Sequence, residues 1–196
     1  VITLLGDDPV TVECGSAYED AGAAAADTCD GDLTVAISVD DSTLDTGVVG
    51  AYVITYNVTD IAGNAAVEVT RTVNVVDTTV PVITLMGDNP ATAECGFAYT
   101  DAGATAADAC DGDISVDIVV GHAVNTAVPG TYEVTYDVSD GASNAGVQVT
   151  RTVNVVDTTP PVITRNGDLE ITIALGGEYT DAGATAMDAC DGDLTA

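Results

Sequence analysis

Short runs in which apolar and polar residues alternate recur along the chain, and turn residues separate them. Residues 1–5 and 10–13 are two such runs, with Gly-Asp-Asp-Pro between them as a turn. Residues 33–39 alternate in the same way, and residues 50–60 form the longest run. Because successive side chains of a strand point to opposite faces, this pattern predicts short β-strands with one buried face.

A hairpin and a linker follow the longest run. Ala62-Gly63-Asn64 predicts a tight turn, and residues 66–76 predict the returning strand. Linkers rich in threonine and proline come next, at residues 77–81 and again at 157–161. Proline prevents the last strand from continuing and stiffens the linker. Four linker threonines are candidates for O-linked sugar, although stiffening by β-branched residues is the favoured interpretation: Thr78, Thr79, Thr158 and Thr159.

One stretch of the sequence, Tyr18 to Thr34, recurs as Tyr99 to Ser115 and as Tyr179 to Thr195. Each copy has Asp-Ala-Gly near its start and ends on Asp-x-Cys-Asp-Gly-Asp. Its alanine-rich middle is predicted to be extended, because the apolar stripe and the caps of a helix are missing. Repetition at a fixed period is the mark of a tandem array of structural units.

The repeat length and the strand pattern together predict an all-β fold. About seven short strands per repeat, with turns about every 8 to 12 residues, are typical of an immunoglobulin-like Greek-key β-sandwich. A unit of about 80 residues is large enough to fold as a domain. We therefore predict tandem sandwiches, as beads on a string: repeat 1 at residues 1–80, repeat 2 at 81–160, and the first half of repeat 3 at 161–196.

The charge of the chain limits its partners. The net charge is −29, with no lysine and three arginines. Such a charge repels nucleic acids and anionic membranes, so neither is expected as a partner. It suits either binding of divalent cations or solvation in a saline exterior. The sequence contains no stretch of 18 apolar residues, so no membrane-spanning segment is predicted. Because the sequence starts inside a repeat, we expect it to be part of a longer protein.

Several motifs resemble a known family. They are Asp-Thr-Thr-Pro-Pro-Val-Ile-Thr, Tyr-Thr-Asp-Ala-Gly-Ala-Thr-Ala, Asp-Gly-Asp-Leu-Thr, Gly-x-Tyr-x-Val-Thr-Tyr-x-Val-x-Asp and Ala-Gly-Asn. Together they resemble bacterial immunoglobulin-like repeats of the pesticidal-crystal-protein type, with hyalin-repeat modules as a looser relative. The resemblance covers essentially the whole chain and is specific for the fold. It implies a spacer or stalk of a secreted or surface protein, including adhesins, or an accessory domain of a secreted enzyme.

The cysteines depart from the commoner family pattern, which has aliphatic residues there. They occupy two recurring positions: Cys14, Cys29, Cys95, Cys110 and Cys190. The two cysteines of a repeat are 15 residues apart, so the simplest prediction is one disulfide within each repeat, Cys14–Cys29 and Cys95–Cys110. Leu175 replaces the first cysteine of repeat 3, which leaves Cys190 unpaired. The alternative is pairing between repeats. Either arrangement implies an oxidising, extracellular or cell-surface location.

Aspartates cluster in the same stretch of each repeat. Three of them lie within six residues around a glycine: Asp27, Asp30 and Asp32; Asp108, Asp111 and Asp113; Asp188, Asp191 and Asp193. In an immunoglobulin-like sandwich we expect these loops to face aspartates of the last hairpin and of the preceding linker: Asp60, Asp77, Asp140 and Asp157. Clustered carboxylates in irregular loops suit Ca²⁺, which is the predicted cofactor. Turn capping by aspartate side chains and binding of other cations are the alternatives.

Catalytic chemistry finds little support. The sequence offers no His-based dyad, no Gly-x-Ser-x-Gly motif and no phosphate-cradling glycine loop. Carboxylate pairs serve glycoside hydrolysis, but sugar sites usually need aromatic platforms, and the chain has no tryptophan and one phenylalanine. We therefore predict that the chain is not an enzyme.

These observations predict an extracellular structural or adhesive array, disulfide-stapled and calcium-stiffened, that forms a stalk, an adhesin shaft or a fibre. Its expected partners are neighbouring repeats of the same chain and an unidentified surface ligand. The alternative is a spacer or binding module of a large secreted enzyme. Residues 161–196 cannot bury a core alone. Either the sequence stops at an arbitrary boundary, or another chain completes this half repeat by strand addition and builds a fibre.

Overall fold

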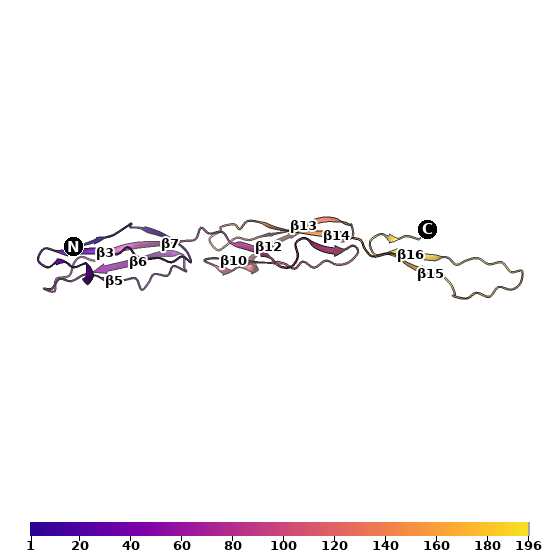
Figure 1. The fold of residues 1–196 in the computed structure, drawn as a ribbon, viewed down its shortest axis with the longest axis horizontal. Coiled ribbons are helices and arrows are strands. Elements are labelled where there is room, and N and C mark those ends of the chain that lie inside the picture. The colour runs from indigo at the N-terminus through magenta and orange to yellow at the C-terminus, as the bar shows by residue number, and fades with distance from the viewer. Residues whose placement is uncertain (196) are drawn as a thin grey trace. The chain divides into compact units, whose positions relative to one another are not determined.

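The computed structural model describes residues 1–195, and among these there is no α-helix. Two single 3-10 turns, η1 (Thr34–Ala36) and η2 (Ser115–Asp117), interrupt the strands (Figure 1). The chain divides into two compact units. The first comprises Val1–Val82, Ala106–Val116 and Ser139–Gly146, and the second comprises Ile83–Thr105, Asp117–Val138 and the chain from Val147 onwards. Two loops of the second sequence repeat therefore belong to the first unit.

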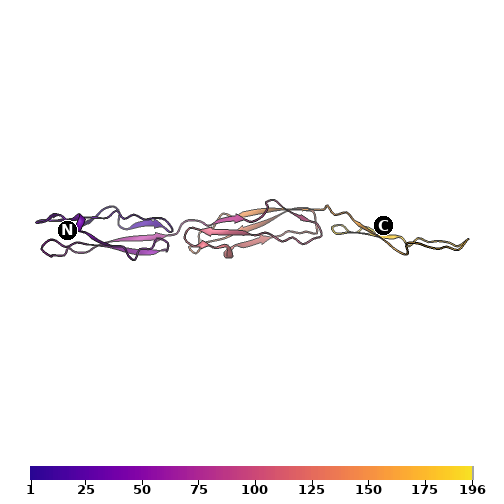
Figure 2. The same ribbon diagram turned by 60° about the horizontal axis from the view of Figure 1, so that its bottom comes forward.

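Two sheets form the first sequence repeat. The smaller has the order β1 (Ile2–Leu4), β3 (Ala23–Asp27), β4 (Gly31–Asp32), and the larger has the order β2 (Val10–Glu13), β7 (Val69–Val76), β6 (Gly50–Asn57), β5 (Ser38–Asp40). β2 pairs with β7 in parallel, and the other pairs are antiparallel. The long strands β6 and β7 lie side by side in both views (Figures 1 and 2).

The second repeat has the same topology. One sheet has the order β11 (Gly112–Asp113), β10 (Ala104–Asp108), β8 (Val82–Leu85), and the other has the order β12 (Val119–His122), β13 (Gly130–Asp137), β14 (Val149–Val156), β9 (Ala91–Glu94). A third copy of the small sheet follows, with β15 (Val162–Arg165), β16 (Ala184–Asp188) and β17 (Gly192–Asp193). The fold is thus an all-β, immunoglobulin-like β-sandwich in tandem, as predicted.

The core of the first repeat lies between its two sheets. Alternate residues of the long strands are buried, including Ile54 and Tyr56 of β6 and Val73 of β7, each with 0% exposure. Ile2 of the small sheet packs into the same cluster. The two-residue period that predicted these strands therefore corresponds to the face that the sandwich buries.

Two strands differ from the prediction at their ends. Residues 34–36 form the 3-10 turn η1 in place of a strand, because the Thr34 hydroxyl accepts a hydrogen bond from the Ala25 N–H, at 3.1 Å, and tightens the chain there. The returning strand starts at Val69, after an isolated bridge between Thr59 and Ala65.

The small sheet of the third repeat is exposed on the face that the other repeats bury. Ile163 of β15 is 74% exposed, whereas its counterpart Ile83 of β8 is 9% exposed. Figure 2 shows β15–β17 as a thin layer. The domain boundaries and the question of what covers this sheet remain predictions, and residue 196 of the predicted third repeat lies outside the described residues. None of the helices among residues 1–195 has the length and apolar character needed to cross a membrane.

Candidate functional site

The disulfides connect different repeats. Cys14 is bonded to Cys110, with a Cα–Cα distance of 5.3 Å, and Cys95 is bonded to Cys190, at 5.1 Å. Cys29 is free and exposed. The predicted pairs Cys14–Cys29 and Cys95–Cys110 are therefore wrong, as is the prediction that Cys190 has no partner. Each bridge lies inside one compact unit, because residues 106–116 belong to the first unit.

The strand arrangement explains why the cysteines of one repeat do not pair. Cys14 lies at the end of β7, where its N–H donates to the carbonyl oxygen of Val76 at 2.7 Å. Cys29 lies near the start of β7, because the neighbouring Asp30 accepts a hydrogen bond from Ile61 in the preceding hairpin. The eight residues of β7 span about 26 Å. A disulfide requires Cα atoms within about 7 Å of each other.

A close backbone approach accompanies the first bridge. Gly15 has φ +76°, which is unfavourable for residues with a side chain, and a Cβ atom there would lie 2.8 Å from the carbonyl oxygen of Ala109. Gly96 follows Cys95 with φ +79°. The Cys-Gly dipeptide therefore forms the turn that admits the cysteine-bearing loop of the next repeat.

The first aspartate of each predicted cluster orders the turn that carries a cysteine. Its Oδ1 accepts two backbone N–H groups, from the second and third residues after it, at distances of 2.7 to 3.2 Å: Asp27, Asp108 and Asp188. The last aspartate of each cluster accepts the N–H of a residue two further on: Asp32, Asp113 and Asp193. The structure does not bring these last three into the carboxylate groups described next.

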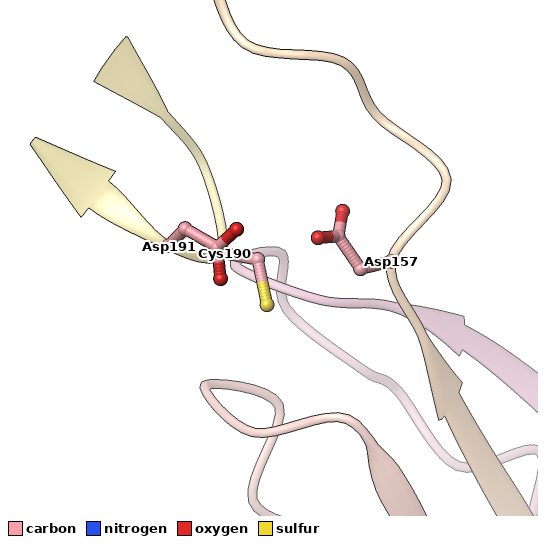
Figure 3. A group of neighbouring side chains, drawn as sticks. All are labelled: Asp157, Cys190 and Asp191. Atoms are coloured by element: carbon pink, nitrogen blue, oxygen red, sulfur yellow. The ribbon is translucent and has the colours of Figure 1, made fainter. Parts of the chain in front are cut away.

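Three carboxylate groups remain, in each of which the possible ligand atoms lie within 4.8 Å of one another: Asp27, Asp30 and Asp60; Asp77, Asp111 and Asp140; Asp157 and Asp191 with Cys190. Figure 3 shows Asp157 directing its carboxylate toward Asp191 and Cys190. The sulfur of Cys190 is not a thiolate, because it is bonded to Cys95. The third group therefore offers only carboxylate oxygens.

The neighbouring negative charges affect the pKa values of the linker aspartates. Desolvation, followed by the charges of Asp108, Asp140 and Asp111, raises the pKa of Asp77. Mutual repulsion of this kind is relieved by a proton or by a cation.

The second linker shows the same effect. Desolvation and then the charges of Asp188, Asp191 and Glu94 raise the pKa of Asp157. Both linkers thus bring an extra carboxylate to an aspartate loop.

Asp140 of the Asp77 group and the neighbouring Asp108, which is not a member of that group, are both buried. Asp140 and Asp108 are each 8% exposed. Asp140 accepts hydrogen bonds from the backbone N–H and the side-chain amide of Asn144, at 2.7 and 2.9 Å. Oδ2 of Asp108 has no hydrogen-bond partner. A buried carboxylate oxygen without a partner is costly, so this atom indicates a place where a ligand would be stabilised.

The sequence did not indicate the buried arginine beneath the Asp-Ala-Gly motif. Arg71 is 1% exposed, forms an ion pair with Asp20, and donates to the carbonyl oxygens of Leu5 and Gly22. Asp20 also accepts from the Tyr56 hydroxyl, at 2.6 Å. The aspartate of the repeated Asp-Ala-Gly motif is therefore the anchor of a buried arginine side chain.

Hydrogen bonds keep this anchor ionised. Burial alone would raise the pKa of Asp20, but the hydrogen bonds from Tyr56, Tyr18 and the Gly22 N–H, with the charge of Arg71, lower it. The second repeat has the same anchor, in which Arg151 lies 3.0 Å from Asp101. The spacing of two of the three arginines at equivalent positions was the available signal.

A glutamate holds each linker. Glu13 accepts the backbone N–H groups and the hydroxyls of Thr78 and Thr79, at 2.7 to 2.9 Å. Glu94 accepts in the same way from the hydroxyls of Thr158 and Thr159. The linker threonines thus fix the chain through hydrogen bonds as well as through their branched side chains.

Comparison with solved structures gives several similar folds. The first, the M60 catalytic domain with CBM51 domains of ZmpB from Clostridium perfringens, is 13% identical with a TM-score of 0.48, covering 87% of this chain and 32% of that one. A lipoprotein from Bacteroides thetaiotaomicron is 20% identical, with a TM-score of 0.36 and 54% of each chain covered. Fibronectin(III)-like modules of CbhA from Clostridium thermocellum are 15% identical, with a TM-score of 0.28, covering 80% of this chain and 95% of that one. A comparison with curated proteins found no match.

A family comparison is more specific. The family described as "Bacterial surface protein, Ig-like domain" matches residues 2–75 and 83–155, in two tandem copies. It supports the bacterial immunoglobulin-like resemblance without selecting the pesticidal-crystal-protein type. Immunoglobulin-like modules are typically non-catalytic, and the family with the two disulfides indicates a location at the surface or outside the cell. The chain belongs to the bacterial surface protein Ig-like domain family.

Proposed function

We propose that this chain is an extracellular, tension-bearing spacer, in which disulfides and a divalent cation join successive repeats. A spacer of this kind serves a stalk, an adhesin shaft or a fibre. The proposal attributes no catalysis to the chain. Its site is the set of loops in which Cys110 and Cys190 are flanked by aspartates.

The observation that carries the proposal is the interlaced connectivity of the two bridges. Cys14 is bonded 96 residues ahead to Cys110, and Cys95 is bonded 95 residues ahead to Cys190. The loops closed by the two bridges overlap between Cys95 and Cys110. A covalent path between the chain ends therefore exists that avoids most of the backbone. Such a path limits the extension of the chain even where a sandwich unfolds. A domain that only had to fold would not require a covalent path of this kind.

Solvation supports the same role. The surface carries most of the net charge of −29, and two of the three arginines are 1% exposed. Repulsion between like charges keeps such a chain dispersed and solvated. The hydrogen bonds that Glu13 and Glu94 accept from the linker threonines restrict bending of the two linkers.

The positions of the arginines allow a direct test of the connectivity. Trypsin cleaves the unfolded, oxidised chain after Arg71, Arg151 and Arg165, and gives four peptides: 1–71, 72–151, 152–165 and 166–196. Alkylation of Cys29 before unfolding prevents thiol–disulfide exchange. We expect mass spectrometry without reductant to find peptides 1–71, 72–151 and 166–196 as one covalent species, with 152–165 released.

Reductant separates all of them and provides the control. Pairing within each repeat would place both partners of each bridge in one peptide, so 1–71 and 72–151 would separate without reductant. That result would refute the spacer proposal.

A further inference from the structure

Three distant parts of the sequence bring carboxylates together in the first compact unit. Asp77 follows β7, Asp111 lies in the turn between β10 and β11, and Asp140 lies in the hairpin between β13 and β14. Their carboxylate oxygens lie within 4.8 Å of one another. Three anions at this distance repel one another unless a cation or protons compensate them.

Hydrogen bonds hold these carboxylates in place. Oδ2 of Asp111 accepts the N–H of Gly141 at 2.6 Å. The side-chain amide of Asn144 bonds Asp140 and also the carbonyl oxygen of Asp77, at 2.9 and 3.1 Å. Since the backbone and Asn144 fix them, the carboxylates do not simply separate into solvent. The arrangement is a preorganised set of oxygen atoms.

A buried atom gives independent evidence for a ligand. Asp108 is 8% exposed, and its Oδ1 accepts the N–H of Asp111 at 3.1 Å, which places it beside the group. Its Oδ2 is buried and has no hydrogen-bond partner. Turn capping accounts for Oδ1 but leaves Oδ2 unexplained. A cation bound to this oxygen satisfies it and compensates the neighbouring anions.

We infer that Asp77, Asp108, Asp111 and Asp140 bind one Ca²⁺ ion. Only oxygen atoms are offered, because Cys110 between Asp108 and Asp111 is bonded to Cys14 and is no thiolate. Ca²⁺ accepts about six to eight oxygen ligands in irregular geometry, whereas Mg²⁺ requires a nearly ideal octahedron. Four carboxylates from irregular loops, with water for the remaining positions, suit Ca²⁺.

The calcium site would serve the proposed spacer function, and only its biological role rests on that proposal. The same loop carries Cys110, so the ion and the Cys14–Cys110 bridge hold one set of segments together. The group Asp27, Asp30 and Asp60 has no fourth carboxylate from a linker, and Asp27 and Asp60 are less buried than their counterparts Asp108 and Asp140. We therefore expect calcium to bind more weakly there.

Calorimetric titration of CaCl₂ into the oxidised 196-residue chain, at constant ionic strength set with KCl, tests the site. Asp108→Asn removes one charge and keeps an Oδ1 that accepts the N–H groups of Cys110 and Asp111. Asp113→Asn is the matched control, since it removes a neighbouring charge outside the group. We expect Asp108→Asn to weaken the tightest calcium binding by about tenfold or more, and Asp113→Asn to leave it within about twofold.

Asp77→Asn changes a half-buried linker residue and gives a second variant if Asp108→Asn fails to fold. No calcium binding by the wild-type chain at about 5 mM would overturn the inference, as would equal losses in Asp108→Asn and Asp113→Asn. Binding of MgCl₂ as tight as that of CaCl₂ would overturn the choice of ion. The tryptic experiment uses no calcium, so separated peptides refute the disulfide-bonded spacer alone. Absent calcium binding refutes the ion site, and with it the cation's part in the spacer, and leaves the disulfide connectivity untouched.

Discussion

The interlaced disulfides predict how far the chain lengthens under tension. In the oxidised chain the shortest covalent path runs through 13 peptide steps from Val1 to Cys14, then 15 from Cys110 back to Cys95, then 6 from Cys190 to the end. At about 3.5 Å per residue this path measures about 120 Å, apart from the two bridges. The reduced chain of 196 residues reaches about 680 Å.

Single-molecule stretching between handles at the two ends measures this length. A Cys29→Ser background removes the free thiol and prevents exchange during pulling. We expect a fully stretched length near 120 Å without reductant and near 680 Å with it. Replacing Cys95 and Cys190 together by serine keeps only the first bridge, and the path then measures about 350 Å.

Pairing within repeats would give another length. Bridges from Cys14 to Cys29 and from Cys95 to Cys110 would shorten the chain only slightly, to about 580 Å. An oxidised chain that extends to that length, or to the length of the reduced chain, would refute the tension-bearing path. The expected length of about 120 Å differs from either of these lengths by far more than the uncertainty in the length per residue.

Two further predictions concern the buried anchor. Arg71→Met leaves Asp20 and two carbonyl oxygens without their partner, so denaturant unfolding is expected to show a loss of about 3 kcal/mol, while the exposed Arg165→Met changes stability by less than about 0.5 kcal/mol. Similar losses in both variants would contradict a role for the buried pair. The second prediction is loss of stability in acid: because the folded-state pKa of Asp20 and Asp101 is lowered, their contribution is complete above about pH 4 and disappears as the pH falls through the folded-state value. Denaturation curves from pH 5 to 2 measure it; a flat free energy of unfolding would argue against it, and Asp20→Asn should reduce the slope. The raised pKa of Asp77 acts in the opposite direction, so in chelator its contribution falls as the pH rises through the folded-state value.

Local features of the sandwich could be predicted from the sequence. The alternation in β6 and β7 depends only on successive residues, and Ile54, Tyr56 and Val73 are buried on that period. Residues 33–39 fail the same rule, because the Thr34 hydroxyl bonds to the backbone of Ala25, nine residues away. An alternating sequence does not contain that tertiary contact.

The cysteine pairs show the limit more clearly. Loop entropy favours a short bridge, and Cys29 lies 15 residues from Cys14. Entropy decides only between cysteines that the fold brings together, and β7 separates these two. The burial of Arg71 could not be predicted from the sequence either, because a charged side chain is usually exposed. The groups that bind Arg71 lie 49 to 66 residues away in the sequence.

The aspartates lie between these cases. The sandwich topology led us to expect that linker and hairpin aspartates face the aspartate loops, and the structure brings Asp77, Asp111 and Asp140 together. The topology did not distinguish them from Asp113, whose side chain bonds Ser115 instead. Only the side-chain hydrogen bonds of each loop separate the two roles.

The overlap of the two bridged loops also makes the molecule redundant toward damage. Between Cys14 and Cys190, backbone and bridges together provide alternative covalent routes. Cleavage of any single peptide bond in this interval leaves two routes intact. A protein exposed to proteases outside the cell therefore remains in one piece after a first cut, and its ends separate only after a cut in each of the three segments 14–95, 95–110 and 110–190, or after a cut combined with loss of a bridge.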